Sequence, residues 1–325
     1  MRRVLWNIAG ILLIVALCMV LFHGPCAAFI MKLDANERLL VVAPHPDDEV
    51  LGCGGLLQRV KALGGTAGVV YLTAGDGCLS LNPFTLVNGR QIHRNLGYRR
   101  INEAVQAMGA LNITKDRMVF LGFPDQGLLP LWRMQAKNPY EEFRSRLTGA
   151  NRVFYTAAES RGLSYDYDSL IQSLSLVIDR FNPTIVLIPS RFDAHPDHQA
   201  TNYFVKMALK NRKRSPKVYS YLVHYKSWPA KSKKQGFYEA MQLPKELPHN
   251  SYELWLVPTE FQCKIQAIRA YRSQHPKVNR NLSSFARGEE IFWRENIGNL
   301  ETPGVKAKPN QRDIEDWKSD YQTFT

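Results

Sequence analysis

The chain has 325 residues, of which 45% are hydrophobic and 22% charged, and its formal net charge is +13. This composition is typical of a globular protein and excludes a low-complexity chain, and the length allows one large α/β domain or two small ones. A basic balance suits an anionic substrate or a membrane surface as well as nucleic acid. The basic clusters at residues 206–217 and 226–234 carry no recognisable nucleic-acid motif, so we predict no nucleic-acid partner.

The N-terminus carries a long apolar segment. Residues 4–22 contain no charged side chain and follow Arg2 and Arg3. This length can just span a bilayer as a helix, whereas the small residues at positions 26–28 could serve as a signal-peptide cleavage site. We expect residues 1–31 to be a membrane anchor or a signal peptide, followed by one domain over residues 32–325. The positive charges before the span predict a domain on the extracytoplasmic side, membrane-anchored or, after cleavage, secreted.

Five cysteines are spread along the chain, at positions 18, 26, 53, 78 and 263. They form no obvious disulfide framework and no Cys-x-x-Cys zinc motif. A pairing of Cys53 with Cys78 in an exported protein is left open.

Short apolar runs alternate with segments of helical periodicity after residue 38. The apolar runs predict strands at residues 39–43, 66–73, 118–122, 184–189, 218–225 and 252–257. Helical spacing predicts helices at residues 50–63, 101–111, 167–181 and 197–210. This alternation favours an α/β fold with a mostly parallel, Rossmann-like sheet and helices on both faces. Residues 127–161 are poorly patterned, and we interpret them as an insertion that could form a lid over a ligand site.

Two related motifs follow predicted strands. Residues 41–50 read VVAPHPDDEV, and residues 188–201 read IPSRFDAHPDHQAT. In each motif an apolar run ends in His-Pro-Asp at the start of a predicted helix. Ligands of open α/β sheets bind in the crevice at the carboxyl ends of the strands, so we expect both motifs in that crevice.

The side chains of these motifs suit a metal site. His45 and Asp48 are three residues apart, and His195 and His198 repeat this spacing, so each pair can face one point at the start of a helix. Two histidines and one carboxylate, with water in the fourth position, form a catalytic zinc site. The histidine and the carboxylate of Asp47 that are not used as ligands are then available for acid–base chemistry. The spacing does not decide which histidine of the second motif binds the metal.

Several motifs, in order, resemble one known family. The stretch PHPDDEVLGCGG at residues 44–55 and HPDH at residues 195–198 are similar to the signatures of the LmbE-like, or PIG-L, family of metal-dependent N-acetylglucosaminyl deacetylases. Residues 100–109, 122–125, 264–274 and 285–292 also resemble segments of that family. The resemblance covers nearly the whole chain after the apolar N-terminus.

The resemblance implies a role for each matching residue. His45, Asp48 and His198 would bind the metal, which would be zinc or ferrous iron. Asp47 would be the general base that takes a proton from the attacking water. His195 would stabilise the oxyanion or protonate the leaving amine.

Other residues have implied or open roles. The resemblance implies that Asp197 orients a histidine of the site and that Arg100 and Asp125 contact the substrate. Glu49 could begin the helix or support a site residue, and His224, at the end of a predicted strand, could face the pocket. The glycines at positions 52, 54 and 55 match no phosphate-loop fingerprint, and we expect them to allow close packing of the helix.

The implied activity is removal of the N-acetyl group from an N-acetylglucosamine-type sugar by a zinc-dependent hydrolase, which releases acetate and a free amine. The substrate could be a glycolipid, a polysaccharide or a sugar conjugate, and the basic charge favours an anionic or lipid-linked one. Two alternatives stay open: a metal-dependent hydrolase of another amide or ester, and a non-catalytic, membrane-anchored glycan-binding protein. Family members that act on GPI precursors carry this domain on the cytoplasmic face, so that placement is open too.

Overall fold

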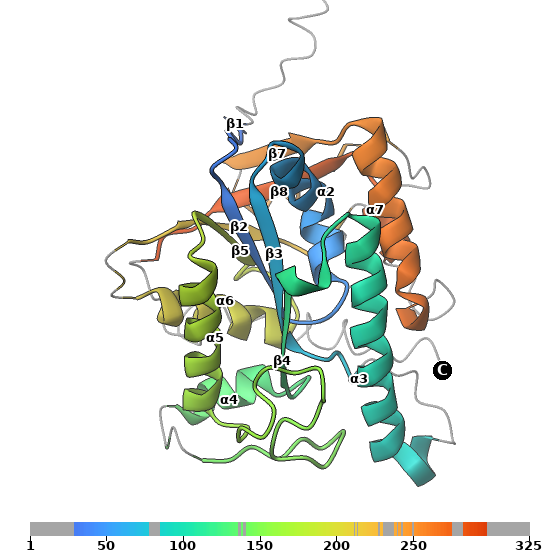
Figure 1. Ribbon diagram of the computed structural model, residues 1–325, viewed down its shortest axis with the longest axis vertical. Coiled ribbons are helices and arrows are strands. Elements are labelled where there is room, and N and C mark those ends of the chain that lie inside the picture. The colour runs from blue at the N-terminus through green and yellow to red at the C-terminus, as the bar shows by residue number, and fades with distance from the viewer. Residues whose placement is uncertain are drawn as a thin grey trace, which may run out of the picture.

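A buried, mostly parallel sheet forms the centre of the fold (Figure 1). Its strands are β1 (Phe29–Ile30), β2 (Arg38–Ala43), β3 (Thr66–Thr73), β4 (Met118–Phe123), β5 (Ile185–Pro189), β6 (Lys217–Tyr221), β7 (Ser251–Trp255) and β8 (Glu289–Arg294). Within the described residues they follow the order β1-β7-β8-β6-β5-β2-β3-β4. Neighbouring strands are parallel except around β8, which is antiparallel to both β6 and β7. The predicted strands and their mostly parallel arrangement are confirmed, whereas β1 and β8 were not predicted.

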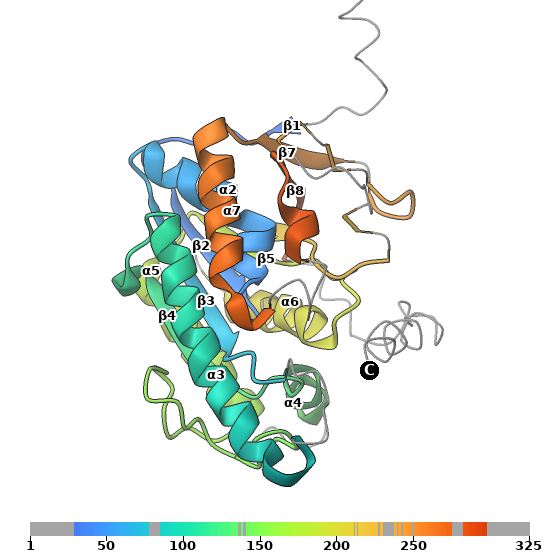
Figure 2. The same ribbon diagram turned by 90° about the vertical axis from the view of Figure 1, so that its right-hand side faces the viewer.

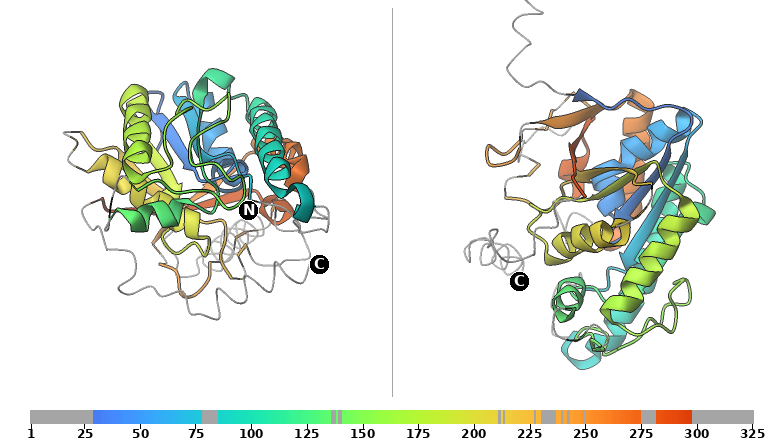
Figure 3. Two further views of the ribbon diagram at one scale, coloured as in Figure 1. Left: turned by 90° about the horizontal axis from the view of Figure 1, so that it is seen from below. Right: turned by 90° about the vertical axis from the view of Figure 1, so that its left-hand side faces the viewer.

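Two layers of helices cover the sheet, as predicted. The helices are α2 (Asp48–Ala62), α3 (Thr85–Ala110), α4 (Leu128–Met134), α5 (Tyr167–Phe181), α6 (Pro196–Leu209) and α7 (Pro258–Ala270), with short 3₁₀ turns η1 (Lys115–Arg117), η2 (Arg272–Gln274) and η3 (Leu282–Phe285). Helices α2, α3 and α7 pack together on one face (Figure 2), and α4, α5 and α6 pack together on the other. The view from below shows the sheet between the two layers (Figure 3).

The computed structural model describes residues 29–77, 85–135, 138, 141–210, 212, 214–226, 228–229, 237–238, 240–241, 243–248, 250–274 and 282–297. The predicted apolar span and Cys78 lie outside these residues, and Cys53 is a free, buried thiol on α2. Among the helices of the described residues, none is long and apolar enough to cross a membrane. Strand β1 pairs with β7, so the sheet begins before the domain boundary predicted at residue 32.

The packing of α2 explains its glycines. The central strands are apolar along their whole length because helices cover both faces, and residues 39–43 and 67–73 are all buried. A Cβ atom on Gly52 would lie 2.4 Å from Cδ2 of Tyr221, and one on Gly55 would lie 1.9 Å from Cδ2 of Leu256. The expectation of close helix packing is therefore confirmed at these two positions.

Three segments differ from the prediction. The helix predicted at residues 101–111 is only the end of α3, whose first half is too polar to show helical periodicity. The segment interpreted as an unpatterned insertion contains α4, a short amphipathic helix that buries Leu128 and Leu131. Residues 258–270 and 289–294, for which no element was predicted, form α7 and β8.

One ion pair is completely buried between α7 and β8. Lys264 and Glu290 both have side chains that are 0% exposed, and Lys264 Nζ lies 2.7 Å from Glu290 Oε1. The same carboxylate accepts hydrogen bonds from the backbone N–H groups of Gly55 and Leu56, at 2.7 and 3.0 Å. Glu290, on the interior strand β8, therefore ties α7 and α2 to the sheet.

Replacing Lys264 with methionine should destabilise the fold strongly, because a buried carboxylate would lose its counter-ion. We expect the free energy of unfolding, measured by urea titration, to fall by about 3–5 kcal/mol. The control is Arg152→Met, which removes an exposed ion pair with Glu142 and should change the stability by at most about 1 kcal/mol. Equal effects of the two substitutions would contradict a structural role of the buried pair.

Candidate active site

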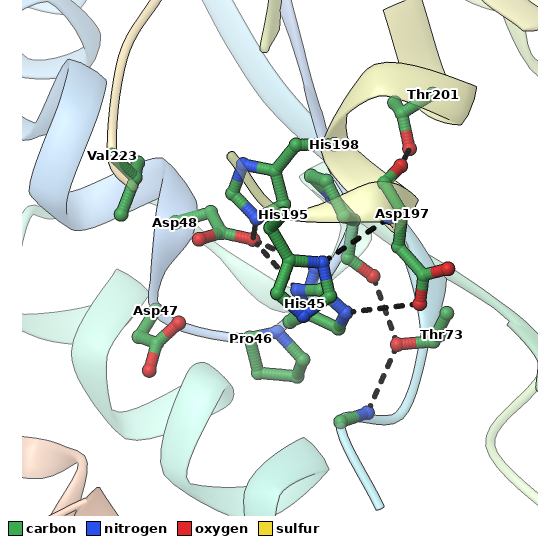
Figure 4. Close-up of polar contacts among 12 residues, drawn as sticks. His45, Pro46, Asp47, Asp48, Thr73, His195, Asp197, His198, Thr201 and Val223 are labelled. Atoms are coloured by element: carbon green, nitrogen blue, oxygen red, sulfur yellow. Dashed lines mark hydrogen bonds and ion pairs between the residues drawn. The ribbon is translucent and has the colours of Figure 1, made fainter. Parts of the chain in front are cut away.

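The turn after β2 holds the first motif in an unusual backbone conformation. Asp47 has a φ of 120° and a ψ of −31°, a region that residues other than glycine rarely adopt, and α2 begins at the next residue. The turn brings the side chains of His45 and Asp48 close together at the carboxyl end of β2 (Figure 4).

The carboxylate of Asp48 lies at the centre of the site. Its Oδ2 atom is 3.2 Å from Nδ1 of His45 and 3.2 Å from Nε2 of His198, and it accepts a hydrogen bond of 2.9 Å from the backbone N–H of His45. Burial opposes the charge on Asp48, but the neighbouring His198 and His45 hold the pKa of this carboxyl well below its usual range. Asp48 is therefore an ionised carboxylate between two imidazoles, and its predicted role as a metal ligand stays a prediction.

The second motif begins α6, and His195 caps this helix. Nδ1 of His195 accepts a hydrogen bond of 3.2 Å from the backbone N–H of Asp197, and Pro196 occupies the first turn. Burial and the neighbouring His45 lower the pKa of His195 well below its ordinary value. The imidazole is therefore neutral at pH 7, with its proton on Nε2, because Nδ1 acts as an acceptor.

His198 is completely buried, and Asp193 fixes one nitrogen of its ring. Its Nδ1 atom lies 3.0 Å from Oδ2 of Asp193. Its Nε2 atom has no hydrogen-bond partner among the described residues, although Oδ2 of Asp48 lies 3.2 Å away at an angle unsuited to a hydrogen bond. Burial opposes a positive charge on His198, but Asp193 and Asp48 outweigh burial and raise its pKa to about 9. A buried nitrogen beside a carboxylate, with its other nitrogen fixed by an acid, is the arrangement of a metal-binding histidine.

Several sets of donors converge on this point. Three sets have ligand atoms within 4.8 Å of one another, namely His45, His195 and His198; Asp48, His198 and His224; and His45, Asp125 and Asp197. Imidazole nitrogen and carboxylate oxygen are suitable donors for a divalent transition metal. The described residues therefore fit a metal ion, and each of the three predicted ligands belongs to at least one set, although no single set contains all three.

Asp47 lies beside the metal-site residues and is held by Arg100. Nη2 of Arg100 donates to Oδ2 of Asp47, at 3.0 Å, and to the carbonyl oxygen of Pro46, while Nη1 donates to the carbonyl oxygen of Gly75, at 2.9 Å. Burial raises the pKa of Asp47 to about 7, although the charge of Arg100 opposes this shift. Arg100 itself is only 3% exposed. Arg100 therefore binds the turn that carries Asp47, and its predicted contact with substrate stays a prediction.

Asp125 and Asp197 both lie beside His45. Oδ1 of Asp125 and Oδ2 of Asp197 are 3.3 and 3.4 Å from its Nε2 atom. Asp197 also accepts backbone hydrogen bonds from Gln126, at 2.6 Å, and Leu128, at 3.1 Å. Asp197 thus contacts a histidine of the site and fixes the start of α4. Asp125 is buried and accepts a hydrogen bond from the backbone N–H of Gly77, which leaves its predicted contact with substrate untested.

Two residues of the site were missed or left open by the sequence. Asp193 was missed, although it lies only two residues before His195. His224 was left open, and its ring centroid lies 4.8 Å from that of His198 and 5.3 Å from that of His195. Burial lowers the pKa of His224 to about 4, so it adds a neutral imidazole to the site.

The comparison with protein families identifies the chain. Residues 40–209, which contain both His-Pro-Asp motifs, match the PIG-L family model, described as GlcNAc-PI de-N-acetylase. The chain belongs to this family. It is therefore an N-deacetylase, a hydrolase that acts on amide bonds.

Curated relatives and solved structures agree with this family. A 1D-myo-inositol 2-acetamido-2-deoxy-alpha-D-glucopyranoside deacetylase of Mycobacterium sp. (strain KMS) is 26% identical over 315 residues, which cover 87% of this chain and 88% of the relative. A relative of the same description from Saccharopolyspora erythraea is 29% identical, over 75% of this chain and 80% of its own. The fold is similar to that of an N,N'-diacetylchitobiose deacetylase from Pyrococcus horikoshii, with a TM-score of 0.51, 16% identity and coverage of 83% and 88%. It is also similar to the A40926 pseudoaglycone deacetylase Dbv21, with a TM-score of 0.52, 19% identity and coverage of 82% and 100%.

Asp193→Asn should weaken metal binding, because a neutral amide holds the Nδ1–H group of His198 less firmly. We expect a loss of about 10- to 100-fold in metal affinity. The measurement is metal content per chain, by mass spectrometry, after dialysis against graded chelator concentrations. Asp179→Asn, which changes an exposed carboxylate paired with Arg212, serves as the control. Unchanged metal content in Asp193→Asn would show that Asp193 does not support the ligand.

Proposed function

We propose that this protein is a zinc-dependent hydrolase that removes the N-acetyl group from an N-acetylglucosamine-type sugar. The main support is the buried, unbonded Nε2 atom of His198 beside the carboxylate of Asp48, with Asp47 on the same turn. His45, Asp48 and His198 would hold the metal, and ferrous iron is an alternative to zinc for this donor set. The names of the curated relatives, which are deacetylases of a 2-acetamido-2-deoxy-glucopyranoside, support the sugar class.

The metal would supply Lewis-acid chemistry. Held by His45, Asp48 and His198, a divalent ion would polarise the acetamide carbonyl and would lower the pKa of water toward neutrality. The protein side chains then have two further tasks, which are to move protons and to stabilise the negative oxygen of the transition state.

Asp47 is the proposed general base. A pKa of about 7 suits a base that must be partly ionised at neutral pH and must still bind a proton. Its carboxylate accepts the proton of the attacking water. Because the same carboxyl group can release that proton near neutral pH, Asp47 can also return it to the leaving amine.

His195 is the proposed oxyanion donor. Its Nδ1 atom accepts a hydrogen bond from the backbone N–H of Asp197, so the neutral ring carries its hydrogen on Nε2. This hydrogen can bond to the carbonyl oxygen as that oxygen becomes negative. The lowered pKa of His195 favours this role over that of an acid, because a neutral imidazole is a poor proton donor to an amine.

Other features of the sequence support a substrate class and a location for the protein. The net charge of +13 supports an anionic or lipid-linked sugar. The apolar residues 4–22 support attachment to a membrane, with the domain on the extracytoplasmic side or, after cleavage, secreted.

The decisive experiment measures acetate release from N-acetyl sugars by the full-length protein and by Asp47→Asn. We expect wild-type activity to disappear with chelator and to return with zinc. Asp47→Asn should keep its metal but lose about 10²- to 10⁴-fold in kcat, the usual contribution of a general base.

The same variant separates a catalyst from a glycan-binding protein. A binding protein would keep its sugar affinity in Asp47→Asn and would release no acetate in either form. Acetate release that survives complete removal of metal would refute the proposed mechanism.

A further inference from the structure

The segment that follows α7 reaches the catalytic turn from outside the part of the chain that matches the family model. The match ends at residue 209, whereas the hydroxyl of Tyr271 donates a hydrogen bond to Oε1 of Glu49. The two side chains are 222 positions apart in sequence and almost completely buried, with exposed fractions of 1% for Tyr271 and 0% for Glu49. Glu49 follows directly after the two aspartates of the first motif.

The other oxygen of Glu49 holds the backbone of Asp47. Oε2 accepts a hydrogen bond of 3.0 Å from the N–H group of Asp47, whose φ of 120° is unfavourable for a residue with a side chain. Such a conformation persists only when surrounding contacts fix it. Glu49 supplies one of these contacts, and Arg100 supplies another through the side chain of Asp47 and the carbonyl oxygen of Pro46.

Helix α3 connects the same two regions a second time. Glu103 lies one turn after Arg100 and accepts hydrogen bonds from the backbone N–H and the hydroxyl of Ser273, at 2.9 and 2.5 Å. One helix therefore binds the catalytic turn through Arg100 and the segment after α7 through Glu103. The contacts form a ring. Asp47 is bound by Glu49 and Arg100, and these two are linked in turn, through Tyr271 and through Glu103 with Ser273, to the segment after α7.

We propose that Tyr271 is a positioning residue for the general base. Its hydroxyl fixes the carboxylate of Glu49, and Glu49 fixes the backbone of Asp47 in the conformation that aims the Asp47 carboxylate at the substrate water. Ser273, bound to Glu103, fixes the segment that carries Tyr271. This inference rests on the proposed role of Asp47 in deacetylation.

The chemistry of the contact favours positioning over simple packing. A phenylalanine ring would fill the same space without burying a hydroxyl, which costs free energy unless it is bonded. The buried carboxyl group of Glu49 likewise needs hydrogen-bond partners, and it has one in the hydroxyl of Tyr271 and one in the turn that it supports. Removal of the single hydroxyl should therefore loosen the turn while the packing of the ring is preserved.

The test is Tyr271→Phe in the full-length protein. We expect kcat for acetate release to fall by about 10- to 100-fold, the usual effect of removing a group that orients a site residue. KM, metal content and Tm should stay close to those of wild type. Amide hydrogen exchange of the peptide that contains Asp47 should become faster, because its N–H group loses a fixed acceptor.

The matched control is Tyr165→Phe. Tyr165 is equally buried, at 1% exposure, and its hydroxyl donates to the backbone oxygen of Gly122 at 3.4 Å. The Tyr165→Phe substitution should leave kcat unchanged. If Tyr271→Phe does not fold, Ser273→Ala removes the hydroxyl contact with Glu103 and should change kcat and exchange in the same direction.

Two results would overturn the inference. One is a kcat within about twofold of wild type together with unchanged exchange at Asp47, which would mean that no transition-state contact was lost. The other is a loss of kcat that merely follows a loss of metal or of Tm. A wild-type protein that releases no acetate would refute the proposed function instead, and the exchange measurement would still show whether Tyr271 holds the turn.

Discussion

The structure of the site depends on one buried carboxylate, that of Asp193. It is 0% exposed and accepts hydrogen bonds from the backbone N–H groups of His195, Val223 and His224 and from Nδ1 of His198. A buried carboxylate is costly unless donors surround it, so these contacts fix one another. Through them, the loop after β5, the loop after β6 and the first turn of α6 take a single arrangement. The orientation of His198 toward Asp48 follows from that arrangement.

The same principle governs the opposite side of the site. Arg100 is buried against Asp47, and its positive charge compensates the carboxylate, whose burial without a partner would be unfavourable. Full neutralisation of Asp47 by the arginine would make it a poor base, whereas burial alone would keep it protonated. The balance of the two effects leaves its pKa at about 7. The unfavourable backbone conformation of Asp47 is likewise maintained by surrounding contacts, because an isolated turn would relax to a more favourable φ.

The sequence predicted the parts of this structure that depend on short-range pattern. Buried strands have continuous apolar runs, and the two His-Pro-Asp motifs mark the turns that follow them, so β2, β5 and the predicted ligands could be located. Contacts between distant segments leave no such pattern. Nothing in the local sequence pairs Tyr271 with Glu49, and the burial of Arg100 depends on where α3 packs. Asp193 was missed because a lone aspartate before a helix is ordinarily read as a surface residue. Helix α4 was missed because seven residues are too few to establish a period.

Residues beyond the family match contribute contacts that hold the site in place. Residues 40–209 supply the predicted metal ligands and Asp47. Some of the groups that fix these residues come later in the chain. Val223 and His224 donate to Asp193, Tyr271 donates to Glu49, and Glu290 accepts from the backbone of α2. A chain ending after α6 would leave β5 without β6 and would leave the buried carboxyl groups of Asp193 and Glu49 short of their partners. Groups that fix the geometry of the site therefore come from both parts of the chain, Arg100 and Asp193 within the family match and Tyr271 after it, and the complete sheet brings them together.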